Sequence, residues 1–377
     1  EMLNMKIEVV HVFDKFLELE KVWKELAEDS DLNNPFITYR FYYCLLKVFF
    51  KNKDLLIFIV KDSEEVIGIA PFFRDGNTIR SINNIHSHYF DFIIRRNHSD
   101  VYRFVFQFIF KNYKFKSIYL GDVCSKSGLY KYILSNDCFI HTLVYERVSP
   151  VLMVTQSWKE FYSSVSKNFR NNYQKRVNKV NRQGEYQIKG CNDFDELDVF
   201  LKDIFDIEKK SWKNLLGRSM FRTSNQPEFY SLLAKVFFEN VKIEILYINN
   251  CPAAFWISLF YKNSVYQLKN SFVEELKEYS PGIILTVECL KSYFEKKVTC
   301  IDYLGVTNSV KSKVSNDSRV AYNFYLYRKS SINHAYIFIK YKVWPKVGRY
   351  SFAQSLKNFI LRKSPAVEGI NRKNLYE

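Results

Sequence analysis

The feature that most limits what this chain can fold into is a series of β-rich and helical segments that occurs twice. In the first half, apolar runs at 55–60 and 66–73 flank a polar turn, which predicts a β-hairpin. A third β-rich stretch at 89–94, a helical pattern at 100–112 and a short strand at 117–121 follow. The predicted order is a meander, a helix and a strand.

The second half repeats this order. Strands are predicted at 243–248, 253–261 and 265–270, a helix at 281–296 and a closing strand at 301–305. Because both copies also end on the same tripeptide, Tyr-Leu-Gly, the pattern indicates an internal duplication.

The length of 377 residues exceeds the size at which one core usually keeps growing. Together with the repeat, it predicts an α/β (α+β) protein with domains at 1–150 and 151–330 and a basic, aromatic-rich extension at 331–377. The formal net charge of +16 favours anionic partners such as nucleotide cofactors, nucleic acid or an acidic membrane surface.

Cysteine usage and apolar runs indicate the compartment. The seven cysteines are scattered and form no Cys-x-x-Cys pair, which predicts a reducing compartment and no structural zinc. No secretory signal pattern opens the sequence, and no run approaches the roughly 18 apolar residues of a membrane span. We therefore expect a cytoplasmic protein, in which the extension at 331–377 suits peripheral contact with the inner membrane face or packs back on the body.

Differences between the two copies locate candidate functional residues. The second-copy helix begins with Ser280-Pro281-Gly282, where the first copy has Ser99-Asp100. A proline at the first helical position beside a glycine leaves backbone N–H groups approachable, so an anion such as a pyrophosphate can bind there. The alternative is that the tripeptide only starts a helix.

A lysine and a basic segment are further differences. Six residues after the shared glycine, the second copy has Lys311 and the first has Ser127. A cation near Asp302 and the anion site can stabilise a developing oxyanion, unless it is an ordinary surface lysine. The segment 161–184 has helical spacing and a basic face without acids, which either is solvated or binds phosphate. Its cations are Lys167, Arg170, Lys175, Arg176, Lys179 and Arg182.

Taken in order, several motifs resemble the branch of the GNAT superfamily that includes the Fem-type peptidyltransferases and the CelD-like (cellulose-biosynthesis) acetyltransferases. The resemblance covers about 15–330. Its motifs are Trp23-Lys24-Glu25-Leu26, Asn34-Pro35-Phe36, Gly68-Ile69-Ala70-Pro71, Ser166-Lys167-Asn168-Phe169-Arg170, Glu208 to Trp212-Lys213, Phe229-Tyr230, Tyr279-Ser280-Pro281-Gly282, and Asp302-Tyr303-Leu304-Gly305 with Lys311.

The resemblance implies two tandem GNAT-like domains, each a mixed, mostly antiparallel sheet flanked by helices. The first, at 1–150, would be degenerate and lie on the acceptor side. The second, at 151–330, would hold the acyl donor and the catalytic groups, with the acceptor in a cleft between the domains. The implied co-substrate is acyl-CoA, with acetyl-CoA the most expected, and no metal is implied.

Site residues follow from the same resemblance. Lys311 matches a lysine that stabilises the reacting carbonyl, and Asp302 is grouped with it. Asp91 on the first domain is the expected acidic residue facing the cleft, where it or a water accepts the proton. Donor contacts are expected from Ser280, Pro281, Gly282 and Asn270. Acceptor contacts are expected from Arg170, Arg176, Lys167 and Trp212.

The sequence departs from the family pattern before the candidate anion site. The usual phosphate loop, in which Gln or Arg leads to two glycines, is absent, and the segment 271–279 contains several acids and no glycine. Val310 also precedes Lys311 where an aromatic residue is common, and Lys313 is a nearby substitute.

We therefore expect direct transfer of an acyl group from acyl-CoA to an amine of a sugar, sugar nucleotide or cell-envelope precursor, either a small molecule or lipid-linked. An aminoacyl-tRNA-dependent peptidyltransferase is the alternative enzyme. Because the helical hairpin arm of some Fem-type enzymes is missing, tRNA is the less expected partner. A non-catalytic GNAT-like protein that binds a glycan or a membrane is the alternative from another class.

Overall fold

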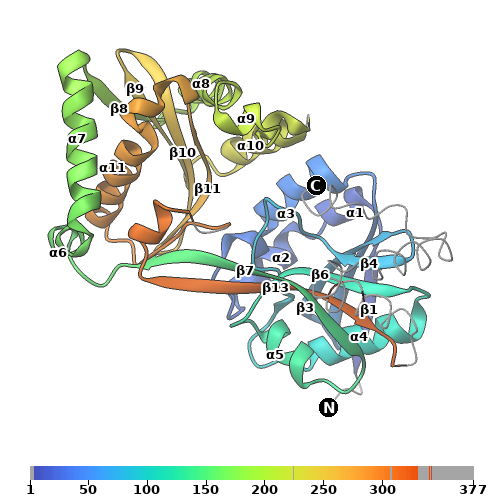
Figure 1. Cartoon of the computed structure of the whole chain (residues 1–377). Coiled ribbons are helices and arrows are strands. Elements are labelled where there is room, and N and C mark those ends of the chain that lie inside the picture. The colour runs from blue at the N-terminus through green and yellow to red at the C-terminus, as the bar shows by residue number, and fades with distance from the viewer. Residues whose placement is uncertain (1–3, 224, 306–307, 330–338, 340, 342–377) are drawn as a thin grey trace, which may run out of the picture. The chain divides into compact units, whose positions relative to one another are not determined.

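The structure is a computed structural model that divides into two compact units (Figure 1). It describes residues 4–223, 225–305, 308–329, 339 and 341. Unit 1 comprises Glu1–Tyr42, Phe50–Arg147 and Val320–Glu377, and unit 2 comprises Tyr43–Phe49 and Val148–Arg319. Apart from Ile339 and Tyr341, the predicted extension at 331–377 lies outside the described residues. The functional domains at 1–150 and 151–330 stay a prediction.

Unit 1 is built on a mixed sheet in the order β1-β2-β3-β4-β6-β13. Its strands are β1 (Met5–Val10), β2 (Asp54–Asp62), β3 (Glu65–Asp75), β4 (Thr78–Ser81), β6 (Ser117–Cys124) and the unit 1 part of β13 (Asp317–Tyr327). The predicted hairpin is confirmed, with Leu55 opposite Phe73. Neighbouring strands are antiparallel except β4 and β6, which are parallel.

The third strand of this unit is not where the sequence predicts it. The predicted stretch at 89–94 contributes only β5 (Ile93–Ile94), which pairs with β3, and the strand that continues the meander is β4. Phe90 and Phe92 are buried in the core without belonging to a regular strand. Their apolar character follows from this burial, whereas β4 is short and partly polar, so the sequence pattern favours the wrong segment.

Helices complete unit 1 and its apolar core. They are α1 (Phe13–Leu17), α2 (Glu20–Glu28), α4 (Val101–Asn112) and α5 (Gly128–Ser135), with a 3₁₀ turn η1 (Pro35–Ile37). Two consecutive segments, α3 (Tyr39–Leu45) and η2 (Leu46–Phe50), lead from unit 1 into unit 2 and back. The helix predicted at 100–112 is α4, whose Val105 and Phe106 are fully buried against β-strand residues such as Phe72.

Unit 2 repeats the sheet, in the order β8-β9-β10-β11-β12-β7. Its strands are β8 (Tyr186–Gly190), β9 (Val241–Ile248), β10 (Cys251–Tyr261), β11 (Ser264–Phe272), β12 (Cys300–Asp302) and the unit 2 part of β7 (Ile140–Met153). Here too one pair, β11 and β12, is parallel and the others are antiparallel. The predicted duplication and the α/β fold with mostly antiparallel sheets are confirmed.

The sequence pattern missed the strands that complete each sheet. β13 follows the second copy in the chain, yet its residues from Val320 onward belong to unit 1 and pair with β6. β7 follows the first copy, yet its residues from Val148 onward belong to unit 2 and pair with β12. Each copy of the repeat therefore receives its last strand from the chain segment that follows the other copy.

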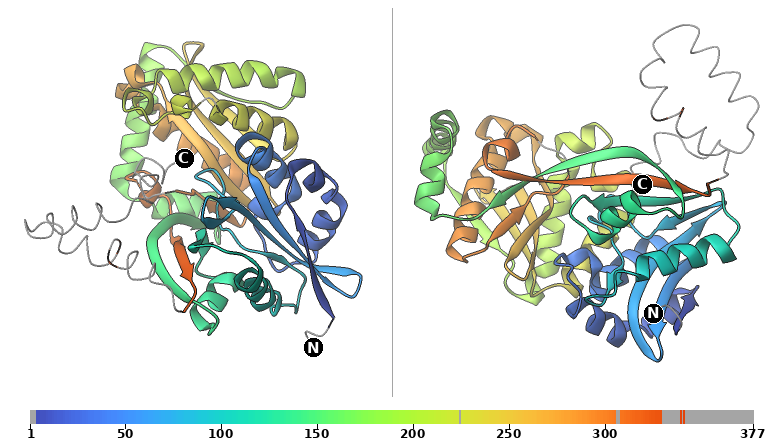
Figure 2. Two further views of the ribbon diagram at one scale, coloured as in Figure 1. Left: turned by 90° about the vertical axis from the view of Figure 1, so that its right-hand side faces the viewer. Right: turned by 90° about the horizontal axis from the view of Figure 1, so that it is seen from below.

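Helices cover both faces of the unit 2 sheet (Figures 1 and 2). They are α6 (Trp158–Ser164), α7 (Lys167–Gln183), α8 (Leu197–Lys209), α9 (Trp212–Leu215), α10 (Asn225–Val236) and α11 (Pro281–Glu295), with short turns η3 (Phe194–Glu196), η4 (Met220–Arg222), η5 (Glu274–Tyr279) and η6 (Lys311–Lys313). Figure 1 shows α11 and α8 on opposite sides of β9 and β10, with α7 beside α11. The core on the α11 side includes Trp256 and Tyr293.

The basic segment at 161–184 is two helices instead of the one that its spacing predicts. Val165 is extended between them, and the Ser166 hydroxyl accepts a hydrogen bond from the Phe169 N–H at 3.3 Å, which caps α7. Cationic side chains of α7 keep the predicted basic face. Within the described part of the chain, no helix is both long enough and apolar enough to cross a membrane.

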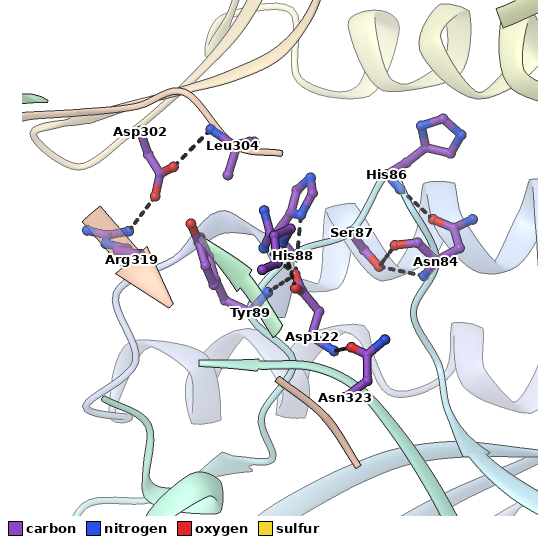
Figure 3. A network of polar contacts seen from close by, with 11 residues as sticks. Asn84, His86, Ser87, His88, Tyr89, Asp122, Asp302, Leu304, Arg319 and Asn323 are labelled. Atoms are coloured by element: carbon purple, nitrogen blue, oxygen red, sulfur yellow. Dashed lines mark hydrogen bonds and ion pairs between the residues drawn. The ribbon is translucent and has the colours of Figure 1, made fainter. Parts of the chain in front are cut away.

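The Asp122 carboxylate, with 14 % of its side chain exposed, contacts several groups near the end of β6 in unit 1 (Figure 3). Asp122 has a positive φ of 57° and accepts two hydrogen bonds from the Arg147 guanidinium, at 2.9 and 2.6 Å. His88 Nδ1 lies 3.2 Å from the same carboxylate, and the Asp122 N–H donates to Asn323 Oδ1 at 2.7 Å. Burial alone would raise the pKa of Asp122, but His88 and Arg147 outweigh it and lower that pKa to about 2.

Replacing Asp122 with alanine should lower the free energy of unfolding by about 3–5 kcal/mol, because a buried arginine loses its carboxylate partner. Urea denaturation measures this change. Asp75→Ala is the control, since Asp75 lies 3.6 Å from Arg80 with half of its side chain exposed, and should cost less than about 1 kcal/mol. Equal effects of the two substitutions would contradict the role given to Asp122.

Candidate functional site

A pocket of about 310 Å³ lies in unit 2 where α9, α11, β10, β11 and the segment after β12 converge. Five residues that the sequence analysis selected line it: Trp212, Asn270, Ser280, Gly282 and Lys311. Pro281, the remaining predicted donor contact, is buried at the first turn of α11. The structure thus brings the expected anion site and the expected catalytic lysine to one pocket.

The pocket forms where the parallel strands β11 and β12 stop pairing and diverge. β11 and β12 pair over only three residues each, Ser264–Tyr266 with Cys300–Asp302. Beyond this point β11 continues to Phe272 while β10 alone pairs with it, and the register between β10 and β11 shifts near Ile257 and Ser258. Such irregularities bend a strand and are common beside active sites.

The N-terminus of α11 forms one wall. Ser280 has a left-handed backbone with φ 49°, and its carbonyl accepts a hydrogen bond from the Ile283 N–H at 2.9 Å. A Cβ added to Gly282 would lie 3.5 Å from the Phe272 ring, which is ordinary contact, so the position tolerates a methyl group but not a large side chain. Oriented N–H groups and the helix dipole favour an anion here.

The segment leading into this helix explains part of the basic face of α7. Residues 274–279 form η5 in place of the missing glycine loop. Arg176 donates to the Glu278 carbonyl at 2.6 Å, and Lys179 forms an ion pair with the Glu278 carboxylate at 2.6 Å. These contacts hold the chain that ends at Ser280.

A strained turn forms another wall. Leu304 and Gly305 both have positive φ, 47° and 60°, which is rare for leucine. The Lys311 ammonium donates to the carbonyls of Tyr303 and Leu304, at 2.7 and 3.1 Å. Lys311 therefore lies where the sequence predicts and is fixed on this turn.

Asp302 forms a hydrogen bond to the turn (Figure 3). It is fully buried and accepts hydrogen bonds from the Leu304 N–H and the Arg319 guanidinium, both at 3.0 Å. Asp302 does not line the pocket, so the geometry gives it a positioning role behind Lys311.

Three further charged residues were missed by sequence reasoning. Lys213 lines the pocket and donates to the Asn270 carbonyl, and Lys269 lies 3.5 Å from the buried Glu208 carboxylate. Burial of the ammonium group and repulsion by Lys269 and Lys311, against attraction by Glu208, lower the pKa of Lys213 to about 8. The sequence signal was the motif from Glu208 to Trp212-Lys213, in which Trp212 alone was assigned a role.

Other predicted residues are not among those that line this pocket. Asp91 of unit 1 is 1 % exposed and accepts hydrogen bonds from the Phe92 N–H and the Tyr102 hydroxyl, and burial raises its pKa to about 6. Its contacts hold α4 to the strand region, which suits a structural role. Lys167 is exposed on α7 and Arg170 is half-buried there, and neither lines the pocket. No cluster of three metal-ligating side chains occurs among the residues described.

The lowered pKa of Lys213 predicts a pH dependence of stability. Between pH 8 and the unfolded-state pKa of about 10.4, the unfolded chain binds more protons at this lysine, so the free energy of unfolding rises with pH. Lys213→Met removes that rise. Chemical denaturation of both proteins at pH 7.5 to 10.5 measures the difference, and parallel curves would contradict the burial of this ammonium group.

A comparison with protein families finds a match for much of unit 2. Residues 167–312 match the family model described as an acetyltransferase (GNAT) domain. No curated protein sequence matches the chain.

Solved structures share the fold at low identity. The crystal structure of FemX is 11 % identical with a TM-score of 0.57, and the alignment covers 88 % of this chain and 99 % of FemX. A conserved protein of unknown function from Bacteroides thetaiotaomicron is 11 % identical with a TM-score of 0.56, covering 86 % and 100 %. L-PGS from Bacillus licheniformis is 12 % identical with a TM-score of 0.51, covering 85 % and 95 %.

Proposed function

We propose that unit 2 transfers an acyl group, most simply acetyl, from acyl-CoA to a primary amine, because residues 167–312 match the family model of an acetyltransferase (GNAT) domain. The acceptor class is an amino sugar, a sugar nucleotide or a cell-envelope precursor, free or lipid-linked. The CelD-like branch of the superfamily is the one that this substrate pair fits.

One observation carries the proposal: a single pocket contains both the start of α11 and Lys311. Backbone N–H groups at the start of α11 suit the pyrophosphate or the adjoining pantetheine of coenzyme A. The unpaired side of β11 beyond Tyr266 runs along the same pocket, so an extended pantetheine chain has backbone groups to bind.

The chemistry then needs no covalent enzyme intermediate. The neutral amine attacks the thioester carbonyl, the oxyanion forms, and its collapse expels the coenzyme A thiolate, which takes up a proton. The Lys311 ammonium stabilises the oxyanion, while Asp302 and the turn at Leu304 keep that ammonium in place. The acceptor amine loses its proton to water.

The basic face of α7 is proposed to contribute to binding of the acceptor. Its Lys167, Arg170 and Arg176 are the cations expected to contact the acceptor. Trp212 lines the pocket with 37 % of its surface exposed. Since Arg176 already bonds the Glu278 carbonyl, its part is to orient the segment before Ser280 as much as to attract phosphate.

Isothermal titration with acetyl-CoA tests the proposal. The wild type should bind with a dissociation constant in the micromolar range, about −8 kcal/mol. Gly282→Trp should abolish binding because the indole fills the pocket, and Gly282→Ala is the matched control that keeps it. Lys311→Met should bind within about threefold of the wild type and lose transfer to glucosamine by 10²-fold or more, in line with about 3 kcal/mol for an oxyanion donor.

Failure of the wild type to bind acetyl-CoA would overturn this proposal. Binding of an aminoacyl-tRNA would then favour a peptidyltransferase. Binding of a glycan or of anionic vesicles without any transfer would favour a non-catalytic protein.

A further inference from the structure

Three residues that line the unit 2 pocket have buried polar atoms without a hydrogen-bond partner among the described residues. They are the Trp256 indole N–H, both atoms of the Gln267 amide and the Ser271 hydroxyl. The three residues are 2 %, 4 % and 5 % exposed. Buried polar groups are almost always paired in native proteins, so a cluster of unpaired ones on a pocket wall indicates a ligand.

The pocket also contains the Lys213 ammonium, on which two further lysines, Lys269 and Lys311, and one acid, Glu208, act. Glu208 Oε1 lies 3.5 Å from Lys269 and accepts the Met220 N–H at 3.0 Å, and Glu208 Oε2 is buried without a hydrogen-bond partner among the described residues. The contact that Lys213 makes is with a neutral carbonyl, that of Asn270. Removing an ammonium group from water costs free energy unless an anion pairs with it.

From these contacts we propose that this part of the pocket binds a carboxylate carried by one of the two substrates. The inference rests on the proposed acyl transfer and narrows its substrate class. A carboxylate offers several acceptor positions and one negative charge for the three neutral donors and the ammonium, while the Gln267 amide oxygen, an acceptor, needs a donor from elsewhere on the ligand. An acetyl group or an amino sugar without a carboxylate brings no anion to Lys213.

The carboxylate binds unchanged and takes no part in bond formation. Two sources have the required chemistry. It is either the far end of a dicarboxylic acyl group on coenzyme A, or a carboxylate on the acceptor amine. In both cases Lys213 pairs with the fixed charge, while Lys311 remains with the reacting carbonyl on the turn at Leu304.

Matched ligands separate the two sources by calorimetry. Succinyl-CoA against acetyl-CoA tests the donor, and muramic acid against glucosamine, with coenzyme A present, tests the acceptor. In the wild type, one ligand with the added carboxylate should bind about tenfold or more tightly than its counterpart without it, as expected for a charge-assisted hydrogen bond. Lys213→Met should remove that preference, Lys213→Arg should retain most of it, and Lys209→Met, on an exposed part of α8, should leave it unchanged.

Proton uptake gives a second readout that does not depend on activity. Because an anion favours the charged form of Lys213, binding of the preferred ligand at pH 8.5 should take up a fraction of a proton. Titration in buffers of different ionisation enthalpy measures this uptake, which should vanish in Lys213→Met. Thermal melting of the variants confirms that each is folded.

The outcomes separate this inference from the proposed function. If acetyl-CoA binds but neither succinyl-CoA nor muramic acid is preferred over its counterpart, the proposed carboxylate subsite is wrong and the proposed acyl transfer stands. A preference that survives in Lys213→Met would also overturn the subsite. If no thioester of coenzyme A binds, the proposed function itself fails.

Discussion

The constraint on which the unit 2 site depends is the early end of one strand pair. β11 and β12 share three residue pairs, and the chain after Asp302 turns away through two residues with positive φ. That divergence exposes one side of β11, places the start of α11 at its edge and leaves room for Lys311 to fold back on the turn. A longer parallel pairing would fill the space with backbone hydrogen bonds and leave no pocket.

In unit 1, the region that corresponds to the pocket has a different structure. β4 and β6 also pair in parallel over three residues, but side chains close the edge. The Ser81 hydroxyl accepts the Gly121 N–H at 2.9 Å and donates to Asn83, whose side chain lies against Gly121. Ser127, the counterpart of Lys311, caps α5. The corresponding region therefore contains structural hydrogen bonds in unit 1 and the candidate functional site in unit 2.

Much of this was predictable from local sequence. The hairpins and the helices α4 and α11 follow from apolar periodicity, and the contrast between Ser280-Pro281-Gly282 and its first-copy counterpart pointed to the pocket. Features that depend on pairing between strands far apart in the sequence could not be predicted from local patterns. The exchange of β7 and β13 depends on partners about 150 to 210 residues away, as in Cys300 with Met153 and Ala321 with Cys124. Burial of Lys213 is invisible in a chain with 56 lysines and arginines.

Hydrogen–deuterium exchange with and without acetyl-CoA tests the central claim most directly, because it reports where on the chain the donor binds. With acetyl-CoA bound, we expect slower exchange of the unit 2 amides at 267–272, 282–286 and 308–314. Amides of unit 1 at 78–81 and 101–106 should exchange at unchanged rates. Protection of the unit 1 segments in place of those in unit 2, or no protection at saturating acetyl-CoA, would contradict it.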